Sequence, residues 1–141
     1  MKITQISVFL ENRAGRLAEV CRLFGDNAID IKALNIAETE SFGVMRLIVN
    51  DSAKALSLLK AHGFTATNTH VVAVEVMDRP SGLAEILEAV NESGLNIEYM
   101  YGFMERHENK AIMVFRFEDP EAAAEALQDK GIGVLTSDIL L

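Results

Sequence analysis

The stretch Asp78-Arg79-Pro80-Ser81-Gly82-Leu83 determines how the rest of the chain is interpreted, because the earlier stretch Asn12-Arg13-Ala14-Gly15-Arg16-Leu17 has the same plan. Each follows a run of strand-forming residues and opens a segment with helical periodicity. A short amide or acidic side chain, a turn-forming Pro or Gly and then an apolar residue predict a tight turn from a strand into a helix. Such a turn exposes backbone N–H groups at the positive end of a helix, which favours a carboxylate or phosphate.

The repeat continues beyond these two turns. Leu17 corresponds to Leu83 at a spacing of 66 residues, and Asp51 corresponds to Asp119 at a spacing of 68 residues. Two extra residues within the stretch 105–109 of the second copy account for the change in spacing. A period this long is typical of a duplicated domain, whereas the units of solenoid proteins are shorter.

Hydrophobic periodicity predicts one order of elements in both copies: strand, helix, strand, strand, helix, strand. In the first copy we predict strands at 3–10, 29–37, 44–49 and 64–69, and helices at 17–27 and 52–62. The fold class that follows is α+β, with two ferredoxin-like βαββαβ units at 1–69 and 70–141. Each unit is expected to be an antiparallel sheet with its helices on one face.

The second copy begins with a strand, Val71–Met77, that is apolar on both sides. Strands of this kind usually have both faces covered. The copies are also joined without a Gly/Ser-rich linker. We therefore expect the two sheets to be docked edge to edge or stacked, within one chain or through a homodimer.

Composition limits the classes of function. Half of the residues are hydrophobic, which predicts a proper core. The formal net charge of -8 argues against a nucleic-acid or anionic-membrane surface. The single cysteine, Cys21, lies on the apolar stripe of a predicted helix, so we expect a buried, reduced thiol. The sequence has no apolar segment long enough for a signal peptide or a membrane span, so a cytoplasmic location is expected.

Several of these residues also have simpler interpretations. Asn12 and Asp78 can be helix N-caps, a role that is compatible with ligand binding. Tyr99 and Tyr101 alternate along a predicted strand and can line a pocket, pack in a core or stack on RNA bases, although the acidic charge weakens the last of these. The three histidines lack metal-ligand spacing, and no acid/base pair or nucleophile stands out. No metal, cofactor or catalytic residue is therefore expected.

The two turns, with the segments that open the second strand of each copy, resemble a tandem ACT domain. Those segments are Asp30-Ile31 and Gly94-Leu95-Asn96-Ile97. The resemblance covers nearly the whole chain and leaves no catalytic domain outside it. In that family the domains pair side by side into one extended sheet, and small ligands, most often amino acids, bind where the first turn of one domain meets the second strand of its neighbour.

The resemblance also implies which residues would bind a ligand. By position, Asn12 and Asp78 resemble the residue that holds the amino group of the ligand. Asn96 resembles a ligand-binding asparagine, and Asp30 takes its position in the first copy. Tyr99 is the side chain expected to shape a pocket above Asn96. The turn residues that would offer backbone contacts to the carboxylate, with their neighbours in the two segments, are Ala14, Gly15, Arg16, Leu17, Ile31, Pro80, Ser81, Gly82, Leu83 and Ile97.

Two departures distinguish the copies. The first has Ala14 where the family favours Pro, and the second has Ser81 where Gly is common. The two sites are therefore not expected to be equivalent. The physical argument for a zwitterionic ligand is the same in both: a helix N-terminus supplies donors to its carboxylate, and an Asp or Asn side chain accepts from its ammonium.

Our first hypothesis is a regulatory protein that senses a free amino acid or similar small carboxylate at the interface between its two ACT-like domains. The alternative is a ligand-independent interaction subunit that regulates an amino-acid biosynthetic enzyme, which would then be its partner. A small enzyme is a distant third hypothesis.

Overall fold

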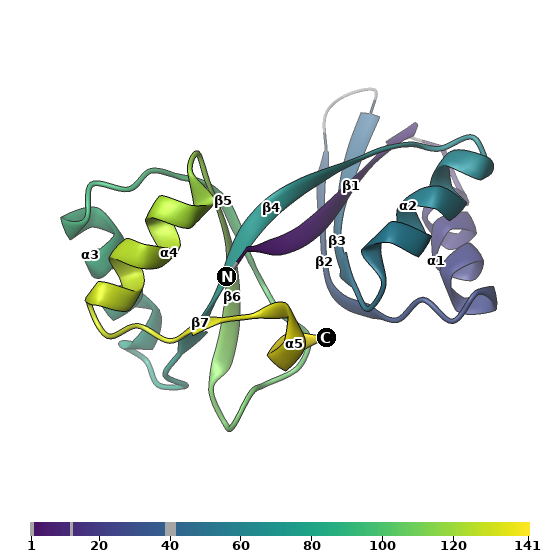
Figure 1. Ribbon diagram of the computed structural model, residues 1–141. Helices are drawn as coiled ribbons and strands as arrows, with labels where there is room; N and C mark the ends of the chain where they lie inside the picture. Colours follow the sequence, from purple (N-terminus) through teal and green to yellow (C-terminus); the bar gives the residue numbers. More distant parts are fainter. Residues whose placement is uncertain (1, 12, 39–41) are drawn as a thin grey trace. The chain divides into compact units, whose positions relative to one another are not determined.

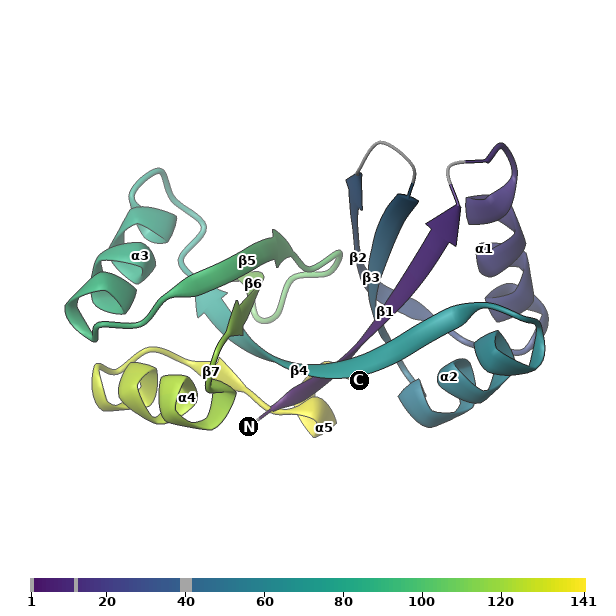
Figure 2. The ribbon, with the colours of Figure 1, turned by 90° about the horizontal axis from the view of Figure 1, so that it is seen from above.

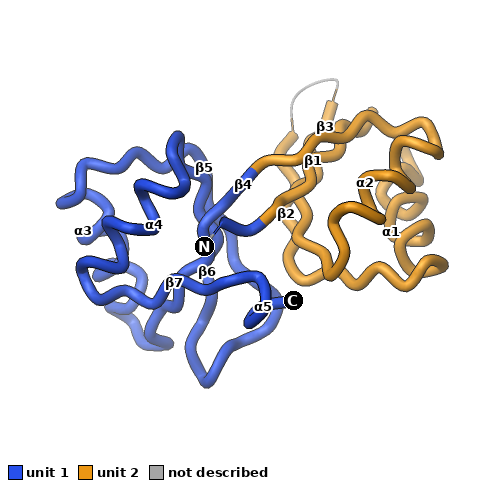
Figure 3. The backbone as a smooth tube through the Cα atoms, in the orientation of Figure 1, with its two compact units in different colours: residues 1–3, 70–141 blue, residues 4–69 orange. Residues whose placement is uncertain are grey.

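The computed structural model describes residues 2–11, 13–38 and 42–141 (Figure 1). Contacts between Cα atoms divide the chain into two compact units, residues 4–69 and residues 1–3 with 70–141 (Figure 3). The α+β class and the two ferredoxin-like units predicted from the sequence are confirmed. The elements are β1 (Ile3–Glu11), α1 (Arg16–Asp26), β2 (Ile31–Glu38), β3 (Phe42–Val49), α2 (Ser52–Ala61), β4 (Thr65–Val76), α3 (Gly82–Glu92), β5 (Ile97–Gly102), β6 (Ala111–Phe117), α4 (Pro120–Asp129), β7 (Val134–Leu135) and α5 (Ser137–Leu140).

The unit of residues 4–69 is a sheet covered on one face by α1 and α2 (Figure 2). Its strands lie in the order β2-β3-β1-β4. β3 pairs antiparallel with both β1 and β2. Alternation along β1 turns Ile6 and Val8 toward the helices, where they join Val20 and Phe24 of α1 in the core. The buried cluster is Ile6, Val8, Leu10, Val20, Phe24, Ile29, Met45, Leu47, Val49, Ala55, Leu59, Phe64 and Ala66.

The second unit repeats this arrangement with α3 and α4. β6 pairs antiparallel with β4 and β5, and β7 pairs with the other side of β4. Phe115 and Phe117 of β6 stack with their ring centres 5.7 Å apart and lie under the helices. The buried cluster is Val72, Val74, Val76, Ile86, Val90, Phe115, Phe117, Ala123, Ala124 and Leu127.

The structure corrects one detail of the sequence analysis at the junction of the copies. The predicted strands at 64–69 and 71–77 are one strand, β4, of 12 residues. This stretch contains no Gly or Pro to interrupt the ladder. Residues 71–74 are all fully buried, so both faces of this part of β4 are covered, as its composition predicted. Docking of the two sheets and homodimer formation remain predictions.

The buried faces of α1 and α3 are narrower than the apolar stripes in their sequences. Cys21 is exposed, so the prediction of a buried thiol is wrong. Burial in α1 rests on Val20 and Phe24, which are one turn apart, and Cys21 is rotated away from them. Leu17 and Leu83 open their helices and are 42% and 37% exposed. Both leucines therefore belong to the surface beside the first turns.

Gly82 makes the second turn possible through a close approach of the backbone. A Cβ atom added at this position would overlap the carbonyl oxygen of Met77. The amide of Gly82 also donates to the carbonyl of Arg79, with nitrogen and oxygen 2.9 Å apart. No other residue type fits in this tight entry into α3 without a shift of the backbone.

We predict that Gly82→Ala lowers the free energy of unfolding by about 1–3 kcal/mol, because the added methyl group forces the turn apart. Gly25→Ala is the matched control, since Gly25 lies inside α1 and its Cβ would meet nothing closer than 4.0 Å. That control should stabilise the chain by roughly 0.8–1 kcal/mol through helix propensity. Urea denaturation measures both, and equal stabilities of the two variants would contradict the crowding at Gly82.

Candidate functional site

The first turn lies between β1 and α1. Gly15 is the N-cap residue, with the left-handed φ of 88° that glycine tolerates, and no side-chain hydrogen bond caps the helix among the described residues. The N–H groups of Leu17 and Ala18 lie in the first helical turn, where they have no intrahelical acceptor. Asn12, predicted to hold the amino group of a ligand, lies outside the described residues.

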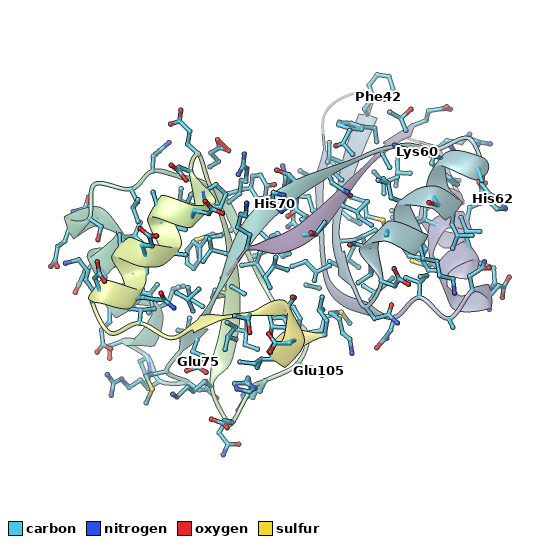
Figure 4. The ribbon with its side chains drawn as sticks, in the orientation of Figure 1. Phe42, Lys60, His62, His70, Glu75 and Glu105 are labelled. Atoms are coloured by element: carbon cyan, nitrogen blue, oxygen red, sulfur yellow. The ribbon has the colours of Figure 1, made fainter. Side chains whose placement is uncertain are left out.

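A cavity of about 100 Å³ lies beside this turn. It combines both charges with apolar walls: Arg13 and Arg16 come from the turn, and Glu11 and Glu38 come from the ends of β1 and β2. Phe42, at the start of β3, is 56% exposed and borders the cavity (Figure 4). The remaining lining residues are Leu10, Leu17, Ile36 and Gly43.

Arg16 is held in place at this cavity. Its guanidinium carbon lies 4.4 Å from the centre of the Phe64 ring, within range for a cation–π interaction. Its Nη1 atom is 2.8 Å from Oε2 of Glu19. The Nε atom is buried and has no hydrogen-bond partner in the described part of the chain. Arg13, by contrast, is 57% exposed and is a solvated turn residue.

The second turn, between β4 and α3, differs in its charges. Ser81 occupies the N-cap position of α3, so the interpretation of Asp78 as an N-cap is wrong. The cap falls at Ser81 because the helix begins at Gly82, four residues after Asp78. Asp78 instead places Oδ2 2.7 Å from Nη1 of Arg106, which comes from the hairpin with the two extra residues. Arg79 binds Glu85 at 2.8 Å.

The residues predicted at the second strands have different surroundings in the two copies. The Asp30 amide donates to Oδ1 of Asn50 at 2.8 Å, and the Asp30 carboxylate is 2.9 Å from Nζ of Lys32. Asn96 lines a cavity of about 300 Å³. Tyr99 is not among the residues that line it and stacks on Tyr101, with ring centres 6.5 Å apart. Ile31 and Ile97 are half-buried at the starts of β2 and β5.

Strand direction separates the first turn from the second strand within each unit. Since β4 and β5 are both antiparallel to β6, they run parallel to each other. Asp78 follows the end of β4 and Asn96 precedes the start of β5, so they lie at opposite ends of β6. β6 has 7 residues, which corresponds to a length of about 20 Å. One unit alone therefore does not bring these two residues together.

Sequence reasoning missed part of the cavity at the first turn. Glu38 and Phe42 were not predicted as site residues, and neither was Arg106, which binds Asp78 at the corresponding end of the second unit. In both units the hairpin that follows the second strand lies at the same end of the sheet as the turn into the first helix. These residues could have been predicted, because the antiparallel strand order expected from the sequence already places the hairpin after the second strand beside the turn into the first helix.

The two ferredoxin-like units, each with a strand-to-helix turn whose N-cap residue makes no side-chain capping hydrogen bond, define a pair of ACT-type domains. A family model described as "ACT domain pair" matches residues 1–140, and the chain belongs to this family.

Solved structures agree with this assignment. Protein BT0572 from Bacteroides thetaiotaomicron is 36% identical, with a TM-score of 0.92 over 99% of this chain and 96% of that one. The ligand-free regulatory subunit of aspartate kinase from Thermus thermophilus is 23% identical, with a TM-score of 0.64 over 89% of this chain and 91% of that one. The corresponding subunit from Thermus flavus is 20% identical, with a TM-score of 0.60 over 89% and 90% of the two chains. No curated protein sequence matches the chain.

The described residues contain no group of three or more His, Cys, Asp or Glu side chains that could hold a metal ion. None of the helices they form is long and apolar enough to cross a membrane.

We predict that Asp78→Ala and Arg106→Ala each change the free energy of unfolding by less than about 1 kcal/mol, because the side chains of this ion pair are 47% and 66% exposed. Asp119→Ala is the matched control, since Asp119 is the N-cap of α4 and accepts from the amide of Ala122 at 3.2 Å. It should cost about 1 kcal/mol. Thermal and urea unfolding compare the three variants, and an equal cost at Asp78 and Asp119 would restore the capping role of Asp78.

Proposed function

We propose that this ACT domain pair is a regulatory protein that binds a free amino acid, or a similar small carboxylate, where the first turn of one domain meets the second strand of another. The observation that carries the proposal is the cavity at the first turn of residues 4–69. The ordered guanidinium of Arg16, the carboxylates of Glu11 and Glu38 and an apolar wall border one small volume beside the start of α1. Those are the groups that a zwitterion with an apolar side chain requires.

The carboxylate of the ligand would bind at the start of α1. The open N–H groups of Leu17 and Ala18 donate to it, and the helix dipole favours its charge. Arg16 adds a cation that is already ordered by Phe64 and Glu19. An ordered donor loses less conformational entropy on binding than a free arginine would.

The ammonium group of the ligand requires acceptors on the other side. Glu11 and Glu38 supply carboxylates at the cavity of the first copy. In the second copy Asp78 supplies the carboxylate, and the guanidinium of Arg106 now occupies it. The ligand ammonium would replace Arg106 there, so we expect the two copies to differ in affinity.

A second domain would complete the site. Asp78 and Asn96 lie at opposite ends of their own sheet, so a ligand that contacts both types of residue needs the turn of one unit and the second strand of another. The strand would come from the sister unit or from a second copy of the chain. Occupancy would then be coupled to packing between domains, which is how a ligand with different affinities for two states produces a regulatory signal.

A thermal-shift series with the proteinogenic amino acids tests the proposal. We expect one or two of them to raise the melting temperature, because a ligand that binds the native state alone stabilises it by mass action. A flat response to all of them would contradict binding of a free amino acid.

Variants of the predicted site residues identify where the ligand binds. Arg16→Ala should weaken binding by roughly tenfold or more, the equivalent of one charge-assisted hydrogen bond. Arg22→Ala, in the same helix but 79% exposed and paired with Asp26, is the control that should bind normally. Asp78→Ala and Asn96→Ala should likewise weaken binding at the second copy without unfolding the chain. Calorimetric titration measures the affinity of each variant. Normal binding by Arg16→Ala, Asp78→Ala and Asn96→Ala would contradict the proposed site.

One observation favours a second function, a ligand-independent regulatory subunit of an amino-acid biosynthetic enzyme. The unit of residues 4–69 exposes several large apolar side chains, as a surface that docks a partner protein does. They are Phe9, Leu17, Leu34, Ile36 and Phe42, which are 38–56% exposed. Melting that no amino acid changes would favour this function over the first.

A further inference from the structure

The turn that precedes the second strand has the same backbone in both units. Ala28 and Gly94 are equivalent at the spacing of 66 residues, and both have positive φ, at 57° and 68°. The following residues also match, since the amide of Ile29 donates to the carbonyl of Phe24 at 2.9 Å, as that of Leu95 does to Val90 at 3.2 Å. Differences between the side chains around the two turns can therefore be compared directly.

In the first unit, two side chains cover this turn. Asn50 accepts from the amide of Asp30 at 2.8 Å and donates to the carbonyl of Ala28 at 3.3 Å. Lys54 extends from α2, and its Nζ atom lies 2.6 Å from the carbonyl oxygen of Asn27, the C-cap residue of α1. In the first unit, the side chain of Lys54 therefore places a primary ammonium group on an aliphatic chain at this turn.

In the second unit, both covering side chains are replaced. At the spacing of 68 residues, Glu118 stands in the place of Asn50 and Ala122 in the place of Lys54. A cavity of about 300 Å³ lies at this position. Ser93 is the C-cap residue of α3, as Asn27 is of α1. The buried hydroxyl of Ser93 has no hydrogen-bond partner among the described residues.

We call this cavity the α4-entry cavity. Its lining suits the group that Lys54 supplies in the first unit, an ammonium on an aliphatic chain. Leu95, Phe117 and the methyl group of Ala122 are apolar and suit an aliphatic chain. Asn96, Glu118 and Asp119 bring oxygen atoms that accept hydrogen bonds. Asp119 also caps α4 by accepting from the amide of Ala122 at 3.2 Å. The remaining lining residue is Gly94.

We propose that the α4-entry cavity binds a small molecule with a primary aliphatic ammonium group. The ammonium takes the position that Nζ of Lys54 has in the first unit, and the carboxylate of Glu118 strengthens its binding through charge. The aliphatic chain lies where the stem of the lysine would lie. This cavity shares Asn96 with the proposed amino-acid site but uses no residue of the first turn, and the match to Lys54 does not depend on amino-acid binding.

The probe that tests the proposal is n-butylammonium, which has the length and charge of a lysine side chain. We expect a titration of the ¹⁵N-labelled full chain to shift the amide signals of residues 94–96, 118, 119, 121 and 122 to saturation. The neutral analogue n-butanol and an equal concentration of sodium chloride should leave these signals in place. No saturable shift with n-butylammonium, or an equal shift with n-butanol, would overturn the proposal.

Two variants distinguish this cavity from general attraction of a cation to an acidic protein. Ala122→Lys restores the tethered ammonium of the first unit and should weaken n-butylammonium binding by at least roughly tenfold. Gln128→Lys makes the same change of charge at an exposed position further along α4 and should bind as the unmodified chain does. Unchanged binding by Ala122→Lys, or an equal loss in both variants, would contradict a site at this cavity.

Discussion

The antiparallel ladder around one strand of each unit is the constraint on which the rest of the structure depends. β3 and β6 each pair with two neighbours that run in the opposite direction, so the neighbours are parallel to each other. This pairing gives every unit two distinct ends. One end holds the turn into the first helix together with the hairpin. The other holds the start of the second strand and the N-terminus of the second helix.

Duplication has kept this frame and changed the charges at its ends. At the first turns, Arg16 rests on Phe64 in one copy, whereas Gly82 takes the same position in the other, where Arg106 binds Asp78 instead. At the opposite ends, Lys54 covers the turn in one copy and Ala122 leaves a cavity in the other. The two copies have therefore acquired different chemistry at both ends of a shared frame, because a few side chains outside the core determine it.

The fold was predictable from the sequence because its signals are regular and local. Periodicity, turn residues and the long repeat all agreed on two βαββαβ units, and mutually consistent signals of this kind are characteristic of a well-specified fold. The errors concern burial along the helices. Leu17 and Leu83 fit the helical stripe but lie at the starts of their helices, whereas Cys21 is rotated away from the buried Val20 and Phe24. A stripe along one helix does not show how far the sheet covers it.

The site was predictable only in outline. The turns themselves follow from residue type, because Gly15 and Gly82 are needed for a positive φ and for a close approach of the backbone. The partners of charged side chains do not follow. The pairs Arg106 with Asp78 and Arg16 with Phe64 join residues far apart in the sequence, and long side chains choose among several partners within reach. The partner of a long charged side chain therefore depends on the folded structure and does not follow from the sequence pattern.

The exposed thiol of Cys21 has a practical consequence. The chain contains one cysteine, and it lies on the surface of α1, one helical turn beyond Leu17. A maleimide dye would therefore attach at a single known position on the unmodified polypeptide. Its fluorescence would report changes around this helix, so the native protein already contains the attachment point for an optical sensor.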